Sequence, residues 1–179
     1  MRVTRRLPLF MVLLTVATAV TTGCMSRGGG GGERGEAERS VRDGVERLMS
    51  ALHRCDLEGF LAEFHSDADF HNPIGIVLRG RSEIGALHEM LFSPQPPPGF
   101  PSFVGTSSTG SIQSLRVLGG DVVVVDWQGT QRGARVGAEE WPERHGANTT
   151  VWTYEHGRWG VAAWRDKDFP SGYQRPPGF

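Results

Sequence analysis

The chain has 179 residues, a length typical of a single domain with short extensions. Its 19 lysines and arginines are nearly balanced by 20 aspartates and glutamates, which gives a formal charge of −1 at pH 7. Because the arginines are scattered along the chain and form no basic stripe, the composition argues against a nucleic-acid partner.

The N-terminus has the pattern of an export signal. Arg2, Arg5 and Arg6 precede the apolar run 7–20, which is short for a membrane-spanning helix but suits the central region of a signal peptide. Small residues follow and lead to Cys24. This arrangement resembles the cleavage site of bacterial lipoproteins. It implies that residues 1–23 are removed and that Cys24 receives the lipid; a plain secretory signal is the alternative.

A lipid on Cys24 would hold the exported protein at the bacterial cell membrane, facing outward and without spanning it. Residues 24–38 follow. Their five consecutive glycines, with no large apolar side chain from Ser26 onward, predict a flexible tether. Loss of residues 1–23 would remove three arginines and no acidic residue, which leaves a formal charge of −4.

The domain is expected at residues 39–168 and begins with helices. Between residues 38 and 54, apolar side chains recur every three or four residues, which predicts a helix with one buried stripe. The stripe consists of Val41, Val45, Leu48, Met49 and Leu52. Asp56 is placed to cap a second, short helix, and Ser82 to cap a third that opens at Arg81.

The rest of the domain predicts an antiparallel sheet. A strand at 69–72 turns at residues 73–75 into a second strand at 76–79, and five prolines between 93 and 103 indicate a stiff loop. Longer strands joined by turns are expected at 106–118, 122–130, 149–155 and 159–166. Residues 131–147 are expected to form a polar excursion and residues 169–179 a tail. Helices followed by strands in this order predict an α+β fold.

Four segments carry a resemblance to a known family. They are DLEGFLAEFHSDADFHNPIG (56–75), LRGRSEIGALHEMLF (78–92), LGGDVVVVDW (118–127) and EHGRWGVAAW (155–164). In order and spacing they resemble the SnoaL-like, or nuclear transport factor 2-like, superfamily, and most of all its SgcJ/EcaC-type branch. The resemblance implies a cone in which a curved antiparallel sheet wraps around about three N-terminal helices and encloses a blind pocket.

One face of the sheet is expected to line that pocket. Alternation puts Trp164 and Asp166 on one face of the last strand, opposite Trp159, Val161 and Ala163. Ketosteroid isomerases share the fold. The resemblance implies that the same alternate positions of each strand face the pocket here as in those enzymes, and these positions hold Phe70, Asn72, Val125, Trp127, Thr150, Trp152, Trp164 and Asp166. The three tryptophans among them are expected at matched depths on successive strands. They either fill the cone or line a cavity for a small apolar or aromatic ligand.

The same resemblance bears on catalysis. The general base of ketosteroid isomerases is an aspartate just before the proline of the first-strand turn, and that position here holds Asn72, whose amide has no useful basicity. The tyrosine and the aspartic acid of their oxyanion hole fall on Leu48 and Thr150. Steroid isomerisation is therefore not implied, and Asp166 is the tentative catalytic residue. Asn72 either orients a ligand or satisfies the turn.

Three functions remain open. The first is a membrane-tethered pocket that binds a small apolar or aromatic molecule. The second is a small-molecule isomerase, cyclase or dehydratase that uses Asp166, with His71 and His88 as further acid–base candidates. The third is a homodimeric envelope scaffold, because this fold commonly dimerises through the outer face of its sheet. No cofactor is implied, and no metal site is expected, since neither HExxH nor a Cys/His ligand spacing is present.

Overall fold

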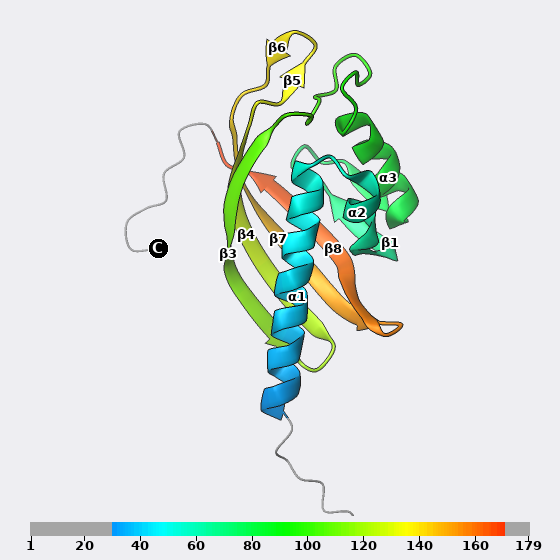
Figure 1. Cartoon of the computed structure of the whole chain (residues 1–179), viewed down its shortest axis with the longest axis vertical. Helices are drawn as coiled ribbons and strands as arrows, with labels where there is room; N and C mark the ends of the chain where they lie inside the picture. Colours follow the sequence, from blue (N-terminus) through cyan, green and yellow to red (C-terminus); the bar gives the residue numbers. More distant parts are fainter. Residues whose placement is uncertain (1–29, 171–179) are drawn as a thin grey trace, which may run out of the picture.

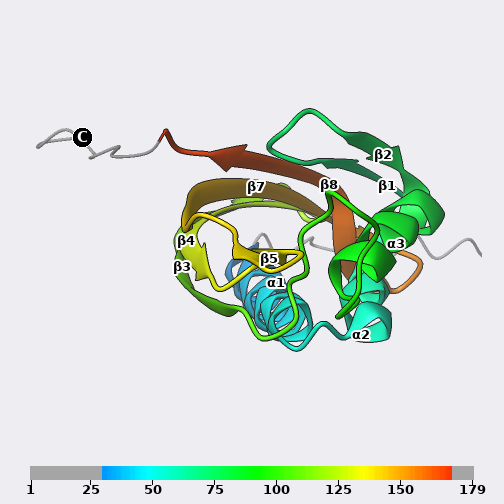
Figure 2. The same cartoon turned by 90° about the horizontal axis from the view of Figure 1, so that it is seen from above.

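Residues 30–170, which the computed structural model describes, form a curved sheet that wraps around a long helix (Figure 1). In chain order the elements are α1 (Gly30–His53), α2 (Leu57–Ala62), β1 (Phe64–His71), β2 (Val77–Arg79), α3 (Gly80–Leu91), β3 (Ser107–Leu118), β4 (Val122–Arg132), β5 (Arg135–Val136), β6 (Glu139–Glu140), β7 (Arg144–Glu155) and β8 (Arg158–Asp168). The main sheet has the strand order β2-β1-β8-β7-β4-β3, and β5 and β6 form a separate pair. Seen from above, α1 lies in the hollow of the sheet, with α2 and α3 near β1 (Figure 2).

The sheet is mixed rather than antiparallel throughout. β1 runs parallel to β8, with Phe70 opposite Trp164 and His71 opposite Arg165. The other neighbouring strands of this sheet pair antiparallel. The expected α+β cone with N-terminal helices is confirmed, while the expectation of a purely antiparallel sheet is wrong. β1 and β8 come from opposite ends of the domain, so no local turn signal could reveal their pairing.

Helix α1 is longer at its N-terminus than the sequence pattern predicts. The expected stripe of Val41, Val45 and Leu48 is buried, and it extends back to Ala37, which is 4% exposed. Because the helix begins at Gly30, residues 30–38 are helical, and the predicted flexible tether is wrong for them. Each glycine lowers helix propensity by about 1 kcal/mol relative to alanine. The low helix propensity of the glycines can be read from the sequence, whereas the packing of Ala37 in the core, which stabilises the helix, cannot.

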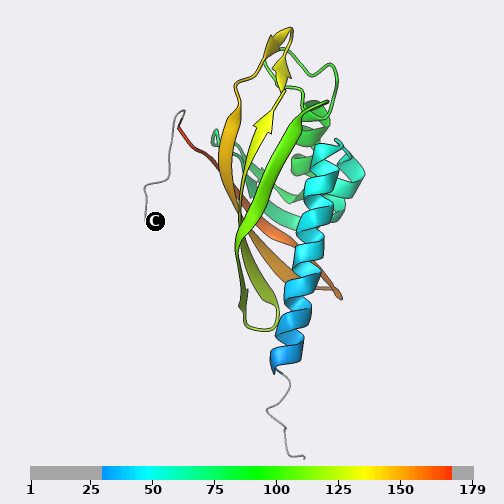
Figure 3. The same ribbon diagram turned by 60° about the vertical axis from the view of Figure 1, so that its left-hand side comes forward.

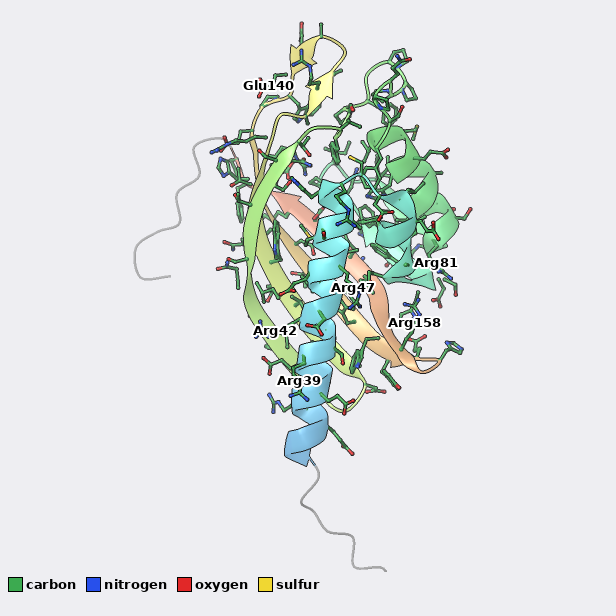
Figure 4. All side chains as sticks on the ribbon, in the orientation of Figure 1. Arg39, Arg42, Arg47, Arg81, Glu140 and Arg158 are labelled. Atoms are coloured by element: carbon green, nitrogen blue, oxygen red, sulfur yellow. The ribbon has the colours of Figure 1, made fainter. Side chains whose placement is uncertain are left out.

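Several sequence predictions lie outside the described residues. They are the removal of residues 1–23, the lipid on Cys24, and most of the tail, residues 171–179. Among the helices of residues 30–170, none is both long and apolar enough to cross a membrane. The exposed side of α1 carries Arg39, Arg42 and Arg47 (Figure 4). Arg47 forms an ion pair of 2.6 Å with the buried carboxylate of Glu63, which ties α1 to the end of α2.

An acidic side chain caps α2 as predicted, whereas the start of α3 differs from the prediction. Asp56 accepts a hydrogen bond from the backbone N–H of Gly59 at 2.9 Å, which confirms the cap of α2. The prediction that Ser82 caps α3 is wrong. The N-cap residue of α3 is Arg79, and no side chain caps this helix; the Glu83 carboxylate reaches back and accepts a hydrogen bond of 2.8 Å from the backbone N–H of Arg79.

The polar stretch 131–147, expected as an excursion, contains short strands. β4 continues to Arg132 and β7 starts at Arg144, while β5 and β6 form an arm that extends beyond the main sheet (Figure 3). Ser102 in the proline-rich loop exchanges two backbone hydrogen bonds with Arg135 of the arm, at 2.7 and 3.2 Å. The arm and the proline-rich loop therefore meet at the same end of the cone.

A β-bulge in β8 changes which side of the sheet the side chains at the start of this strand occupy. Ala163 pairs with Val151. The next pair joins Val161 to Trp152, so β8 contains one extra residue at this point. An extra residue reverses the alternation of side chains, and Val161 is fully buried in the core with Trp164. The prediction that Val161 faces away from Trp164 is wrong for this reason.

Candidate ligand-binding site

A cavity of about 370 Å³ opens at the end of the cone where the arm and the proline-rich loop meet. Its rim includes Ile74 of the β1–β2 turn, Phe100 of the loop and Trp141 after β6. Met49 and Leu52 reach it from the C-terminal half of α1. Most of the wall is apolar, with these side chains among its members: Phe60, Phe70, Leu87, Leu91, Phe103, Trp127 and Trp164.

Several polar side chains of the sheet lie side by side on neighbouring strands, at the same depth in the cavity. Asn148 on β7 pairs with Asp166 on β8 and, on its other side, with Trp127 on β4. Asn72 follows one residue after the last β1–β8 pair, beside Asp166. All of them line the cavity. We call Asn72, Asp166 and Asn148 the polar level.

The tryptophans of the three central strands lie at three successive levels. Trp127 lies beside the polar level. Trp164 is one level deeper, opposite Thr150, and Trp152 is deeper again, opposite Val161. The expectation of matched depths is wrong. The depth of each tryptophan is set by the register between neighbouring strands, not by its distance from the nearest turn.

The eight expected pocket residues divide into two groups. Five line the cavity: Phe70, Asn72, Trp127, Trp164 and Asp166. Three lie beneath it in the core, with exposed fractions of 1%, 3% and 0%: Val125, Thr150 and Trp152. Trp152 donates from Nε1 to Oγ1 of Thr150 at 2.9 Å, so its polar group is satisfied inside the core. Trp152 therefore fills the cone, whereas Trp127 and Trp164 line the cavity.

Two glycines make room for the side chain of Trp127. Gly110 on β3 pairs with Gly129 on β4. The indole ring lies across both, and a Cβ atom at either position would overlap ring atoms. Neither glycine was among the predicted site residues. A signal was present, because Gly129 follows Trp127 by two residues and so shares its face of the strand.

Asp166 is a buried carboxyl group in the polar level. Asn148 donates a hydrogen bond from Nδ2 to its Oδ1 at 2.9 Å. Burial raises the pKa of Asp166, while hydrogen bonding from Asn148 and from the indole of Trp164 lowers it. Nε1 of Trp164 is sealed from solvent and has no well-aligned partner among the described residues. The Asn148 bond is therefore the stronger of the two contacts.

Arg144, at the upper end of the cavity, pairs with Asp168 rather than with Asp166. Its Nε and Nη2 donate to the two carboxylate oxygens of Asp168 at 3.0 and 2.7 Å. Such a two-point pair fixes both side chains, although partial exposure limits its stabilisation to about 0–1 kcal/mol. Within residues 30–170, Asp166 forms no salt bridge, although the positive charge of Arg144 acts on it from a longer distance and lowers its pKa.

His88 lines the cavity from α3. Its Nδ1 donates to the carbonyl oxygen of Ile84 at 2.8 Å, and its ring centroid lies 4.3 Å from that of Phe60. Because a carbonyl only accepts, the proton is on Nδ1, and Nε2 of the neutral ring carries a lone pair. Burial lowers the pKa of His88 to about 4, which keeps the ring neutral at pH 7.

Asn72 satisfies the turn after β1. Its Oδ1 accepts hydrogen bonds from the backbone N–H groups of Ile74 and Ile76, at 3.1 and 2.7 Å. These two bonds fix the plane of the amide. Its Nδ2 donates to none of the described residues, so the structural role of Asn72 leaves a fixed donor available.

His71, the other histidine candidate, does not line the cavity. Its Nε2 is 3.2 Å from Oδ1 of Asp69, which also pairs with Arg165 at 2.5 Å and Arg79 at 3.1 Å. This charge cluster connects β1 with β2 and β8. In the described part of the chain, no group of three or more metal-ligating side chains is placed to hold a metal ion.

Other proteins share this fold. A family model described as a SnoaL-like domain matches residues 45–162. A Nostoc punctiforme domain of unknown function with a cystatin-like fold is 23% identical, with a TM-score of 0.59 over 75% of this chain and 78% of that chain. An uncharacterised Caulobacter vibrioides protein with a cystatin-like fold is 16% identical, with a TM-score of 0.65 over 76% and 92%. A ketosteroid isomerase-like protein from Erwinia carotovora atroseptica is 13% identical, with a TM-score of 0.61 over 74% and 95%. At these identities the likeness shows the fold alone, and no curated protein matches the chain.

Proposed function

We propose that this chain, which belongs to the SnoaL-like domain family, binds a small apolar or aromatic molecule in its cone. The proposal rests on a cavity of about 370 Å³ whose wall is mostly apolar and rich in aromatic side chains, with polar side chains such as Asn72, Asn148 and Asp166 among its members. Small-molecule sites commonly measure about 300–1,000 Å³ and combine an apolar lining with a few placed polar groups. Trp127 and Trp164 supply flat apolar area to this wall.

The proposal is tested by calorimetric titration of the protein with naphthalene, a flat apolar probe. Leu52 lines the cavity, and Leu52→Trp would fill part of it, so saturable binding is expected in the wild type and lost in the variant. Leu118→Trp is the matched control, because Leu118 is 48% exposed and lies away from the cavity. Absence of saturable binding, or equal binding by both variants, would show that the cavity is not a binding site for such molecules.

A second candidate function is an isomerase, cyclase or dehydratase acting through Asp166. The observation in its favour is a buried carboxyl group whose pKa is raised by burial and which lines the cavity. A base with a raised pKa takes a proton more effectively near neutral pH. 2-Tetralone, a cyclic ketone of suitable size, would then take up deuterium from D₂O next to its carbonyl group. Asp166→Asn should stop this exchange, and exchange at an unchanged rate in the variant would reject the assignment.

The N-terminal pattern supports a further part of the proposal, namely that the protein is exported and held at the outer side of a bacterial membrane by a lipid on Cys24. Met49 and Leu52, which line the cavity, lie near the C-terminal end of α1, at the far end of this helix from Gly30. A lipid on Cys24 would therefore be attached on the side of α1 that is farther from this part of the cavity wall. Metabolic labelling with a fatty acid should mark the wild type, and Cys24→Ser should remain unlabelled and leave the membrane fraction.

A homodimer formed through the outer face of the sheet, which is common for this fold, completes the proposal. The outer face carries apolar side chains, such as Val124 of β4 and Val151 of β7, which pair with each other and are half-buried. Light scattering on the chain without residues 1–23 should give a dimer mass. Val124→Lys should give a monomer, and a monomeric wild type would exclude the dimer.

A further inference from the structure

The polar groups that remain unpaired in the cavity restrict the kind of molecule that it can hold. In residues 30–170, three sealed side-chain atoms make no hydrogen bond: Trp164 Nε1 in the cavity wall, and Asp69 Oδ1 and His71 Nε2, which lie outside it and 3.2 Å from each other. Nε2 of His88 is not among them, and no hydrogen bond from a described residue reaches it. Because His88 lines the cavity, this lone pair opens on the space that a ligand would occupy.

A second acceptor belongs to the polar level. Oδ1 of Asp166 is occupied by the Asn148 amide, whereas no well-aligned hydrogen bond from the described residues reaches Oδ2, which is not a sealed atom. Asp166 stands on β8 and His88 on α3, so the two acceptors approach the cavity from the sheet side and from the helix side.

A fixed donor of the polar level is the Nδ2 group of Asn72. The turn holds the Oδ1 atom of this amide through Ile74 and Ile76, so its orientation cannot reverse without the loss of two hydrogen bonds. The cavity thus offers acceptors at His88 and Asp166 and a donor at Asn72, within a wall that is mostly apolar.

We propose that the ligand class is a hydroxylated aromatic or alicyclic molecule whose hydroxyl group donates a hydrogen bond to Nε2 of His88. This inference depends on the proposed ligand-binding function and narrows its ligand class. A hydroxyl group both donates and accepts, so its oxygen is also available to the Nδ2 group of Asn72. A purely apolar ligand of the same size would displace water from these groups and leave them unpaired, which costs binding free energy.

Three probes of similar size separate the possibilities: 2-naphthol, 2-methoxynaphthalene and naphthalene. The first has a donor, the second has the oxygen without the donor, and the third has neither. At pH 7 in calorimetric titrations, 2-naphthol is expected to bind at least about tenfold more tightly than either of the others, the factor that one buried hydrogen bond supplies.

His88→Phe should reduce this preference to about twofold or less, because phenylalanine keeps a flat ring among the neighbouring aromatic side chains but has no lone pair for the hydroxyl group. Circular dichroism of the variant checks its folding, and the comparison of probes on the wild type stands without it. Equal affinity for all three probes would overturn the hydroxyl inference and leave the ligand-binding function intact. Failure of all three to bind would overturn both. A preference for 2-naphthol that survives in a folded His88→Phe would reject His88 as the acceptor.

Discussion

The indole ring of Trp127 lies across Gly129, in the space that any Cβ atom at position 129 would occupy. Gly110 on the neighbouring strand leaves the same space free. Trp127 is therefore held against the sheet by the absence of two side chains, and this sets the width of the cavity beside it.

Gly129→Ala should displace this ring. The added methyl group cannot coexist with the present position of Trp127, and overpacking of this kind typically costs about 1–3 kcal/mol. We expect a loss of stability in that range by urea denaturation, together with weaker binding of the naphthalene probe. Gly120→Ala is the control, since a Cβ there meets no atom within 4 Å, and it should change stability by less than about 0.5 kcal/mol. Equal stability of the two variants would contradict the position of the ring.

Two glycines of α1 should respond to alanine in opposite directions. Alanine favours a helix by up to about 1 kcal/mol over glycine, and at Gly32 a Cβ would meet nothing within 4 Å, so Gly32→Ala should stabilise the protein. At Gly44 the Cβ would lie 2.7 Å from Cζ3 of the fully buried Trp152. Gly44→Ala should therefore destabilise it by about 1–3 kcal/mol. Thermal denaturation measures both, and stabilisation by Gly44→Ala would show that Trp152 does not pack against α1.

The pH dependence of stability should report the burial of His88. Its pKa is about 4 in the folded protein, against about 6.5 for an unfolded histidine. The neutral ring is therefore favoured by folding, and its contribution is fully present above pH 6.5 and is lost as the pH falls toward 4. The loss amounts to about 3 kcal/mol over that interval.

Urea denaturation between pH 8 and pH 4.5 measures this effect, with His88→Phe as the comparison. Phenylalanine does not titrate, and the carbonyl of Ile84 keeps its helical hydrogen bond in the variant. Asp166 and Asp168, the other acidic groups on the cavity wall, are present in both proteins and cancel in the difference. The stability of the wild type should fall relative to the variant below pH 6.5. Parallel curves would mean that His88 is hydrated.

The sequence predicts those parts of the fold that depend on local periodicity. The spacing of Val41, Val45 and Leu48 located the buried stripe of α1, and Asp56 located the start of α2. The bulge before Val161 and the parallel pairing of β1 with β8 depend on contacts between distant segments. Neither leaves a local signal, so no window of sequence could have predicted them.

The same distinction applies to the candidate site. Alternation placed Trp164 and Asp166 on one face, and both line the cavity. Depth could not be predicted, because it is fixed by the register between strands, and so Trp152 lies in the core rather than at the cavity wall. The contribution of His88 depends on its hydrogen bond to Ile84, a detail that residue type alone does not specify.

Asp166 and Asp168 lie two residues apart on β8, and their amide variants should affect stability in opposite directions. Burial raises the pKa of Asp166 above the unfolded value of about 3.9. Folding thus favours the neutral carboxyl group, and its contribution is present at low pH and is lost as the pH rises through the folded pKa. An asparagine is neutral throughout and keeps an oxygen for the Asn148 amide, so Asp166→Asn should raise the melting temperature at pH 7 and lose this advantage toward pH 3. Asp168→Asn should lower the melting temperature at pH 7, by no more than about 1 kcal/mol in free energy, because it breaks the two-point pair with Arg144. Destabilisation of the protein by Asp166→Asn at pH 7 would show that the carboxylate is hydrated or paired, and Asp166 would then no longer qualify as a proton acceptor tuned by burial.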